Sequence, residues 1–452
     1  MDPMNKEMLR LALPSILANL TVPLVGMVDI AIAGHLDTSA AALIGGISVG
    51  SLMFDLLYWN FGFLRAGTGG MTAQAFGRQD WADCAGNLTR GVGLAFLIAV
   101  VLIALQWPFQ KLIFLFVGCS EEVRTLALEY FYIRIWAAPA TLCLMAFRGW
   151  FIGMQDTFSS MLADVIVNGG NILFSLLLAF GIPGTGFNGL GFKGIAWGTV
   201  AAQYSGLLFA SGRVALKFGN ILAGRRLFDF RSAFAGGKVG RFFSVNRDLF
   251  IRSVCLIIVY LAFTAISARF GDTLLAACSI MLKLLIVFSY FTDGFAFAGE
   301  ALTGRFTGMR DLSGVRRAVR YTFIWSMGIG LIFIGIYSFA GVPALRLMTS
   351  DASVVEAARA FIPWLVFIPL VGCPAFTWDG IYTGATATRA MRDSNIGCVL
   401  AFFAIWFSGI FIFNPSGVAS AHLLFAAYYA HLIYRSLYQT VFYRRSILAP
   451  LL

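Results

Sequence analysis

The sequence has little charge, little histidine and no polar stretch long enough for a soluble domain. Of its 452 residues 12% are charged and three are histidines, whereas 59% are hydrophobic. Soluble domains carry about 25% charged residues, so the composition excludes a sizeable soluble core. Apolar segments of some twenty residues recur from end to end, and each can cross a bilayer. We therefore predict an integral membrane protein.

The sequence also lacks the motifs of the commonest enzymes and of ATP-driven pumps. Most of the seven cysteines lie in apolar segments, so they give no disulfide framework. The histidines do not form HExxH, no Ser/His/Asp set is visible, and no GxxxxGK[ST] motif follows a strand. A polytopic membrane enzyme is therefore disfavoured, and no cofactor is predicted. Because the sequence shows no ATP site, any transport by this chain would draw its energy from an ion gradient or from the substrate's own gradient.

The net charge of +11 does not indicate nucleic acid, because the basic residues gather in alternate loops. One set of loops holds the basic run from Arg213 to Arg247 and the tail with Arg444 and Arg445. The intervening loops are nearly free of lysine and arginine. This alternation predicts a lipid bilayer as the partner, no nucleic acid, an even number of spans and both termini in the cytoplasm.

The apolar pattern predicts about twelve transmembrane helices and an all-α fold. The longest polar connection, 218–240, is basic and falls near the middle of the chain. It predicts two six-helix bundles, 1–217 and 241–452, joined by this cytoplasmic linker. The predicted spans are 8–35, 42–68, 89–113, 125–154, 158–181, 193–217, 243–269, 274–302, 315–340, 354–385, 393–413 and 418–440.

The two halves repeat each other at nearly one offset. RGWFIGMQDT, residues 148–157, and DGIYTGATAT, residues 379–388, align Gly149 with Gly380, and 380 − 149 = 231. The same offset aligns Asp80 with Asp311 after the second and eighth spans. Six spans per half give the two copies one orientation, which is a parallel repeat. Transporters with this plan hold the substrate between the repeats.

The first span carries one acid, Asp29, deep in an apolar run that Pro14 and Pro23 interrupt. A carboxyl group at membrane depth is costly and is by default a functional-site hypothesis. Each proline removes a helix hydrogen bond and offers a place to bend. The alternative for Asp29 is a structural hydrogen bond to a neighbouring helix.

Four motifs make the chain resemble the multidrug and toxic compound extrusion (MATE) family, and within it the DinF-like branch. They are VDIAIAGHLD, FGFLRAGTGGMTAQAFGRQD, FRGWFIGMQDT and YFTDGFAFAGEALTGRFTG. The resemblance implies two six-helix bundles, a monomer in the bacterial inner membrane, and export of small cationic or amphipathic compounds against protons or sodium ions. It implies that Asp29 takes up the coupling proton and that Pro14 is the hinge, with Pro23 as a second candidate.

The fifth span departs from the pattern of some relatives, which place a second acid there. Asn168, Asn171 and Ser175 follow at helical spacing, and Ser175 stands where that acid would be. The seventh span also lacks the glutamate of some sodium-coupled relatives. These missing acids favour protons over sodium ions.

Further charges at membrane depth have two interpretations each. Asp55 in the second span either binds cations beside Tyr58 and Trp59 or pairs with Arg65 or Arg134. In the carboxyl-terminal bundle, a second ion or substrate site competes with a buried ion-pair network, which we favour. That set is Asp293 and Glu300, seven residues apart, with Lys283, Asp248 and Arg252.

Two charges of opposite sign, Arg148 and Asp379, occupy matching positions of the repeat. They could latch one conformation across the pseudo-symmetry axis, or each could reach toward the interface. A lipid-linked saccharide flippase is the alternative function, because Arg65, Arg134 and Arg148 could bind a diphosphate.

Overall fold

The computed structural model describes residues 2–36, 40–115, 117–182, 184–221, 229, 233–234 and 238–452, and these residues are almost entirely helical. They fall into two compact units, with Leu17–Phe242 in the first and Met1–Ile16 together with Phe243–Leu452 in the second. We call these the amino-terminal and carboxyl-terminal units. The residues up to Ile16 thus group with the later half of the chain, whereas the predicted bundles were 1–217 and 241–452. Most of the predicted linker 218–240 lies outside the described residues.

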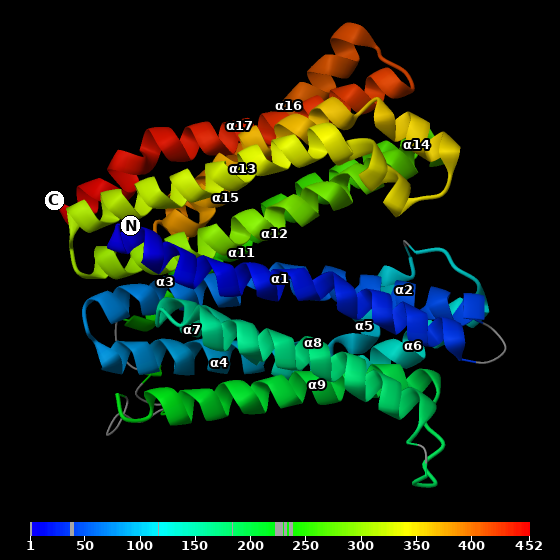
Figure 1. The fold of residues 1–452 in the computed structure, drawn as a ribbon, viewed down its shortest axis with the longest axis horizontal. Coiled ribbons are helices and arrows are strands. Elements are labelled where there is room, and N and C mark those ends of the chain that lie inside the picture. Colours follow the sequence, from blue (N-terminus) through cyan, green and yellow to red (C-terminus); the bar gives the residue numbers. More distant parts are fainter. Residues whose placement is uncertain are drawn as a thin grey trace. The chain divides into compact units, whose positions relative to one another are not determined.

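The amino-terminal unit is a bundle of helices in which α8 and α9 pack closely, as do α3 with α7 and α2 with α6 (Figure 1). The first helix, α1 (Pro3–His35), runs unbroken through Pro14 and Pro23 and enters this unit at Leu17. The other elements are α2 (Ala40–Tyr58), η1 (Trp59–Gly62), α3 (Phe63–Gly77), α4 (Trp81–Ala104), α5 (Gln106–Ile113), α6 (Glu121–Arg134), η2 (Ile135–Ala137), α7 (Ala138–Gly153), α8 (Thr157–Phe180), α9 (Phe192–Arg213) and η3 (Val214–Phe218).

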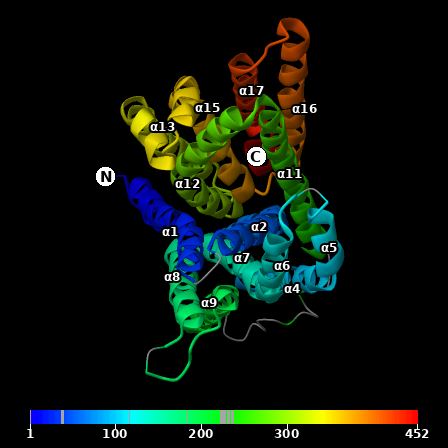
Figure 2. The same cartoon turned by 90° about the vertical axis from the view of Figure 1, so that its right-hand side faces the viewer.

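The carboxyl-terminal unit packs α12 against α13 and α15, and α16 against α17, as the view along these helices shows (Figure 2). Its elements are α11 (Lys238–Ser267), η4 (Ala268–Phe270), α12 (Asp272–Gly308), α13 (Leu312–Met348), α14 (Ala352–Arg359), α15 (Ile362–Gly384), α16 (Thr388–Phe413), α17 (Val418–Tyr443), η5 (Arg444–Leu448) and η6 (Ala449–Leu451).

Ten helical stretches in the described part of the chain are long and apolar enough to cross a membrane. Several predicted spans are interrupted helices, since 42–68 covers α2, η1 and α3, and 125–154 covers α6, η2 and α7. The predicted spans 193–217 and 418–440 correspond to α9 and α17, which are 22 and 26 residues long but not among the ten. The all-α, multi-pass membrane fold is confirmed.

Aspartates fix where four of the helices begin. The Asp80 carboxylate accepts a hydrogen bond from the Asp83 amide ahead of α4, and the Asp311 carboxylate accepts one from Gly314 ahead of α13. Asp156 and Asp351 do the same for α8 and α14. Each cap satisfies an amide that the first helical turn leaves without a partner.

The predicted repeat holds at the level of single backbone contacts. A Cβ atom on Gly149 would clash with the carbonyl oxygen of Arg65, and one on Gly380 with that of Ala296. Both pairs are related by the offset of 231 residues. Glycine therefore lets α7 approach α3, and α15 approach α12, in the same way.

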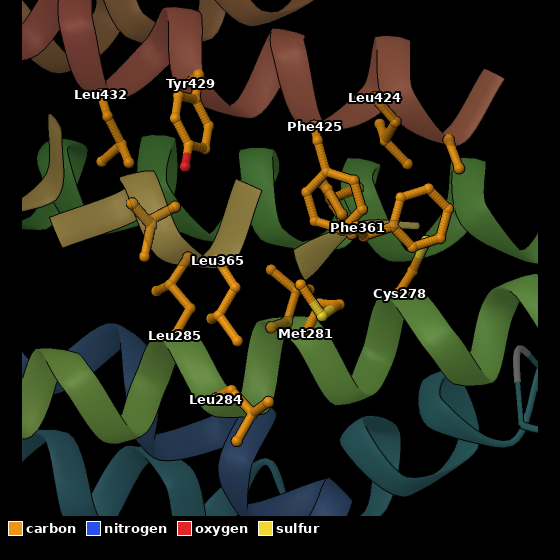
Figure 3. Close-up of a cluster of buried hydrophobic side chains, with 14 of the residues drawn as sticks. Cys278, Met281, Leu284, Leu285, Phe361, Leu365, Leu424, Phe425, Tyr429 and Leu432 are labelled. Atoms are coloured by element: carbon orange, nitrogen blue, oxygen red, sulfur yellow. The ribbon is translucent and has the colours of Figure 1, made fainter. Parts of the chain in front are cut away.

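The core of the carboxyl-terminal unit is a large apolar cluster between α12, α15 and α17. Figure 3 shows Met281 and Leu285 of α12 facing Phe425 and Leu432 of α17, with Leu365 of α15 between them. All five side chains are at least 93% buried. Among the described residues, a smaller cluster in the amino-terminal unit surrounds Trp150 and Phe151.

Candidate functional site

The buried acid predicted from the sequence lies on α1 inside the amino-terminal unit. Asp29 is 3% exposed, and its neighbours are the hydroxyl group of Ser175 on α8 and the guanidinium group of Arg134 on α6. Its Oδ1 atom has no hydrogen-bond partner among the described residues. A buried carboxyl with a spare oxygen has room for one more bond, to a proton or to a ligand.

Ser175 can serve two acceptors but has one hydrogen. Its Oγ lies 3.3 Å from the carbonyl oxygen of Ile195 on α9, and it also hydrogen-bonds with the Asp29 carboxyl. A hydroxyl group donates one bond and accepts two. Ser175 can therefore donate to only one of the two acceptors at a time, and in the structure it donates to Ile195.

The other two polar residues of α8 hold neighbouring helices. The side chain of Asn168 donates to Oγ1 of Thr21 on α1 at 2.5 Å. The side chain of Asn171 donates to Oγ1 of Thr199 on α9 at 2.8 Å and is 2% exposed. Asn168 thus contacts α1 at Thr21, two residues before Pro23, and Ser175 contacts it at Asp29, whereas Asn171 ties α8 to α9.

Arg134 lies near Asp29, which the sequence did not indicate. From the sequence, Arg134 was a possible partner only for Asp55 or for a diphosphate. Its guanidinium group donates to Oη of Tyr130 at 2.9 Å and to Oγ of Ser51 at 3.5 Å. It also lies 4.8 Å from the centre of the Phe54 ring. These contacts hold a fixed cation within electrostatic range of Asp29 and of Asp55.

Asp55 lies on the exposed side of α2, a turn before the half-buried Tyr58 and the exposed Trp59. Its attraction to Arg134 agrees with the pairing interpretation. Because Asp55 is exposed, a cation could also reach it beside the aromatic rings, and this second interpretation stays a prediction.

The second set of charges, in the carboxyl-terminal unit, consists largely of ion pairs. Asp379 pairs with both Arg252 and Arg435. Asp248 pairs with Arg392 at 2.9 Å and accepts from Oγ1 of Thr388 at 3.3 Å. These pairs agree with the favoured interpretation, a network that fixes helix packing.

The remaining charges of that set lie on α12. Glu300 is fully buried, Asp293 is partly buried and Lys283 is exposed. Lys283 therefore points away from the buried side where Glu300 lies. The proposal of a second ion site at Asp293 and Glu300 stays a prediction.

Arg148 and Asp379 each find partners within their own unit. Nε of Arg148 lies 2.5 Å from Oδ1 of Asp164 on the next helix, α8. Asp379 has its two arginines. Both charges are thus compensated within their own units, Arg148 by Asp164, and the possible latch between them stays a prediction.

The model of the MatE family matches the chain twice, over residues 14–177 and 249–412. The two matches fall in the two halves related by the repeat.

Proteins with known names extend this likeness. DNA damage-inducible protein F of Escherichia coli is 33% identical over 86% of this chain and 83% of its own length. A probable multidrug resistance protein NorM of Rhizobium meliloti is 26% identical over 89% of this chain and 84% of its own.

Solved structures show the same fold. A crystal structure of a MATE protein in the bent conformation matches with a TM-score of 0.82 and 18% identity, over 99% of this chain and 96% of that one. The Vibrio cholerae MATE transporter VcmN in the bent form matches with a TM-score of 0.81 and 16% identity, over 99% and 97%.

Proposed function

The chain belongs to the MatE family, and we propose that it exports cationic or amphipathic compounds in exchange for protons. Membership makes it a multi-pass membrane transporter and not an enzyme. Export of drug-like compounds is supported by relatives whose names describe multidrug resistance. We place the protein in the bacterial cytoplasmic membrane as a monomer, with both termini in the cytoplasm.

The observation that carries the proposal is the surroundings of Asp29. The acid is buried at membrane depth, keeps one oxygen without a partner, and has a serine hydroxyl that can follow its protonation state. Such a group can hold a proton during one half of a transport cycle and release it in the other. Proton binding would turn the Ser175 hydroxyl toward Ile195, and proton release would turn it back to Asp29.

Protons suit this site better than sodium ions. Sodium binds through several oxygen atoms at once, and a nearby fixed cation repels it. Arg134 is such a cation, because Tyr130 and Ser51 hold its guanidinium group in place. A proton forms a covalent O–H bond, and the loss of the carboxylate charge simply releases Arg134 from its attraction to Asp29.

Motion of α1 would connect this chemistry to transport. The helix belongs to the carboxyl-terminal unit up to Ile16 and to the amino-terminal unit from Leu17, three residues after Pro14. Proline interrupts the hydrogen-bond ladder and lowers the cost of bending there. We propose that Pro14 is the hinge of alternating access and that Pro23, six residues before Asp29, adjusts the site locally.

The flippase alternative is weakened by acids that lie beside two of the three arginines on which it depends, Arg134 and Arg148. Asp164 neutralises Arg148, and Asp29 and Asp55 lie within range of Arg134. A diphosphate would have to displace these acids to gain the same charges.

Uptake of a fluorescent cationic dye into inverted vesicles tests the proposal, first with a pH gradient and then with a sodium gradient. We expect proton-driven uptake in the wild type and its loss in Asp29→Asn. Asp272→Asn is the matched control, because Asp272 is an exposed acid at the start of α12. Sodium-driven uptake, or full proton-driven uptake in Asp29→Asn, would overturn proton coupling at Asp29. Absence of dye movement in every variant would favour the flippase.

A further inference from the structure

A cluster of three charged side chains lies inside the carboxyl-terminal unit, and proton-driven export does not use it. Arg252 comes from α11, Asp379 from α15 and Arg435 from α17. Their side chains are 19%, 14% and 3% exposed, respectively. We call this cluster the arginine pair site.

The two guanidinium groups share one oxygen atom. Nη2 of Arg252 and Nη2 of Arg435 both donate to Oδ2 of Asp379. Oδ1 of Asp379 and the Nε atoms of both arginines have no hydrogen-bond partner among the described residues. The site therefore keeps spare N–H donors and spare acceptor capacity at the same time.

The cluster carries one positive charge more than it can neutralise. Two guanidinium groups stay charged at any physiological pH, and one carboxylate offsets one of them. Cys398, Tyr428 and His431 also lie within electrostatic range of Arg435, and these groups carry no negative charge near neutral pH.

A net charge in a largely buried position is unfavourable unless an opposite charge joins it. Guanidinium groups present planar pairs of donors that match a carboxylate and also bind simple anions. The partial exposure of Arg252 and Asp379 leaves the cluster reachable, while the buried Arg435 gives it a fixed wall.

We propose that the arginine pair site binds a monovalent anion, either a halide ion or the carboxylate of an amphipathic substrate. The anion approaches the spare donors of the two arginines and competes with Asp379 for them. Its binding neutralises the cluster. This inference does not depend on the role of Asp29, which lies in the other unit.

Two other ion-pair clusters, those of Arg148 and Arg392, differ from it in stoichiometry. Arg148 has the single acid Asp164, and Arg392 has two acids, Asp248 and Asp393. Neither of these clusters has an excess of positive charge, so neither should bind an anion. Arg392→Gln in the same unit is therefore the matched control.

Calorimetric titration of the purified full-length protein with sodium bromide and with sodium benzoate tests the proposal. We expect saturable binding in the wild type and about tenfold weaker binding in Arg252→Gln, the size of one lost charge-assisted hydrogen bond. Asp379→Asn should bind more tightly, because it removes the competing carboxylate. Bromide binding alone would assign a halide ion, and preference for benzoate would assign a substrate carboxylate.

An anion site predicts weaker anion binding in Arg252→Gln and tighter binding in Asp379→Asn. In a purely structural cluster, both substitutions would only lower stability. If Arg252→Gln does not fold, Arg252→Lys keeps the charge without the planar donors and should bind several-fold more weakly than the wild type. Absence of saturable binding in the wild type would overturn the proposal. Equal affinities in the wild type, Arg252→Gln and Arg392→Gln would overturn it as well.

Discussion

The two units have equivalent helices, but residues at corresponding positions of these helices differ in polarity. In the amino-terminal unit, α6 and η2 precede α7, and Tyr130 and Arg134 of α6 form part of the polar site. The residues 231 positions later are Phe361 and Leu365, both in the apolar core of the carboxyl-terminal unit. The position of a cation in one unit is thus the position of a leucine in the other.

The same contrast holds between α8 and α16, which begin at Thr157 and Thr388, again 231 residues apart. Asn171 and Ser175 of α8 correspond to Phe402 and Trp406 of α16. The asparagine and serine form hydrogen bonds, whereas the phenylalanine and tryptophan join the apolar cluster. The repeat therefore gives both units the same backbone, and at these positions only the amino-terminal unit has the polar side chains of the proposed proton site.

The largest effect is expected from exchanging the residues at the corresponding positions 134 and 365. Leu365→Arg places an unpaired charge in the apolar core and should destabilise the protein by several kcal/mol or prevent folding. Arg134→Leu gives the amino-terminal unit the residue of its counterpart, so it should fold but lose at least tenfold in transport. Thermal unfolding followed by dye transport measures both. A stable Leu365→Arg protein would contradict the contrast between the units.

Next in size is a change that should affect both units alike. Gly149→Ala and Gly380→Ala each force a methyl group against a backbone carbonyl oxygen and should each cost about 3 kcal/mol. Gly169→Ala and Gly335→Ala are the controls, because a Cβ atom there meets nothing within 4 Å. The unfolding temperatures should fall for the first two variants only. A large difference between Gly149→Ala and Gly380→Ala would weaken the backbone repeat.

A smaller effect should follow from removing the hydroxyl group beside Asp29. Ser175→Ala keeps the acid but removes the donor that follows its charge, so transport should slow several-fold without abolition. Ser205→Ala on α9 is a control, because that hydroxyl only bonds the carbonyl oxygen of Ala201 in its own helix. Initial rates of proton-driven uptake compare the variants. Unchanged rates in Ser175→Ala would contradict the proposed role of the Ser175 hydroxyl group.

The smallest effect concerns the caps outside the membrane. Hydrogen bonds from the Gly314 amide and the Ser313 hydroxyl lower the pKa of Asp311. This contribution to stability is present above the carboxyl's unfolded pKa and is lost as the pH falls through its lower folded value. Asp311→Ala should cost about 1 kcal/mol at pH 7 and less at pH 3. Unfolding temperatures at the two pH values test this, and an equal loss at both would contradict the capping role.

Much of the architecture could be predicted from the sequence, because hydropathy, loop charge and glycine spacing are local signals. The offset found from Gly149 and Gly380 holds in the structure. Asp29 and Ser175 could be brought together because one acid and one polar helix face stand out from apolar surroundings.

The pairing of charges between helices could not be predicted in the same way. Arg252 and Asp379 are 127 residues apart, and which residues meet depends on how each helix is rotated. Membrane helices are apolar on the lipid side as well as on the packed side, so periodicity does not fix that rotation. From the sequence, Arg148 is a candidate partner for Asp379, whereas in the structure Asp164 lies beside Arg148 on the next helix.

The most direct test of the central claim, that a single acid in the amino-terminal unit carries the coupling proton, is proton release on substrate binding. Purified protein in a weakly buffered detergent solution is mixed with a cationic dye, and the released protons are counted with a pH indicator. The wild type should release about one proton per dye molecule bound, and Asp29→Asn should release none while Arg252→Gln releases as many as the wild type. Equal release from wild type and Asp29→Asn would contradict the account.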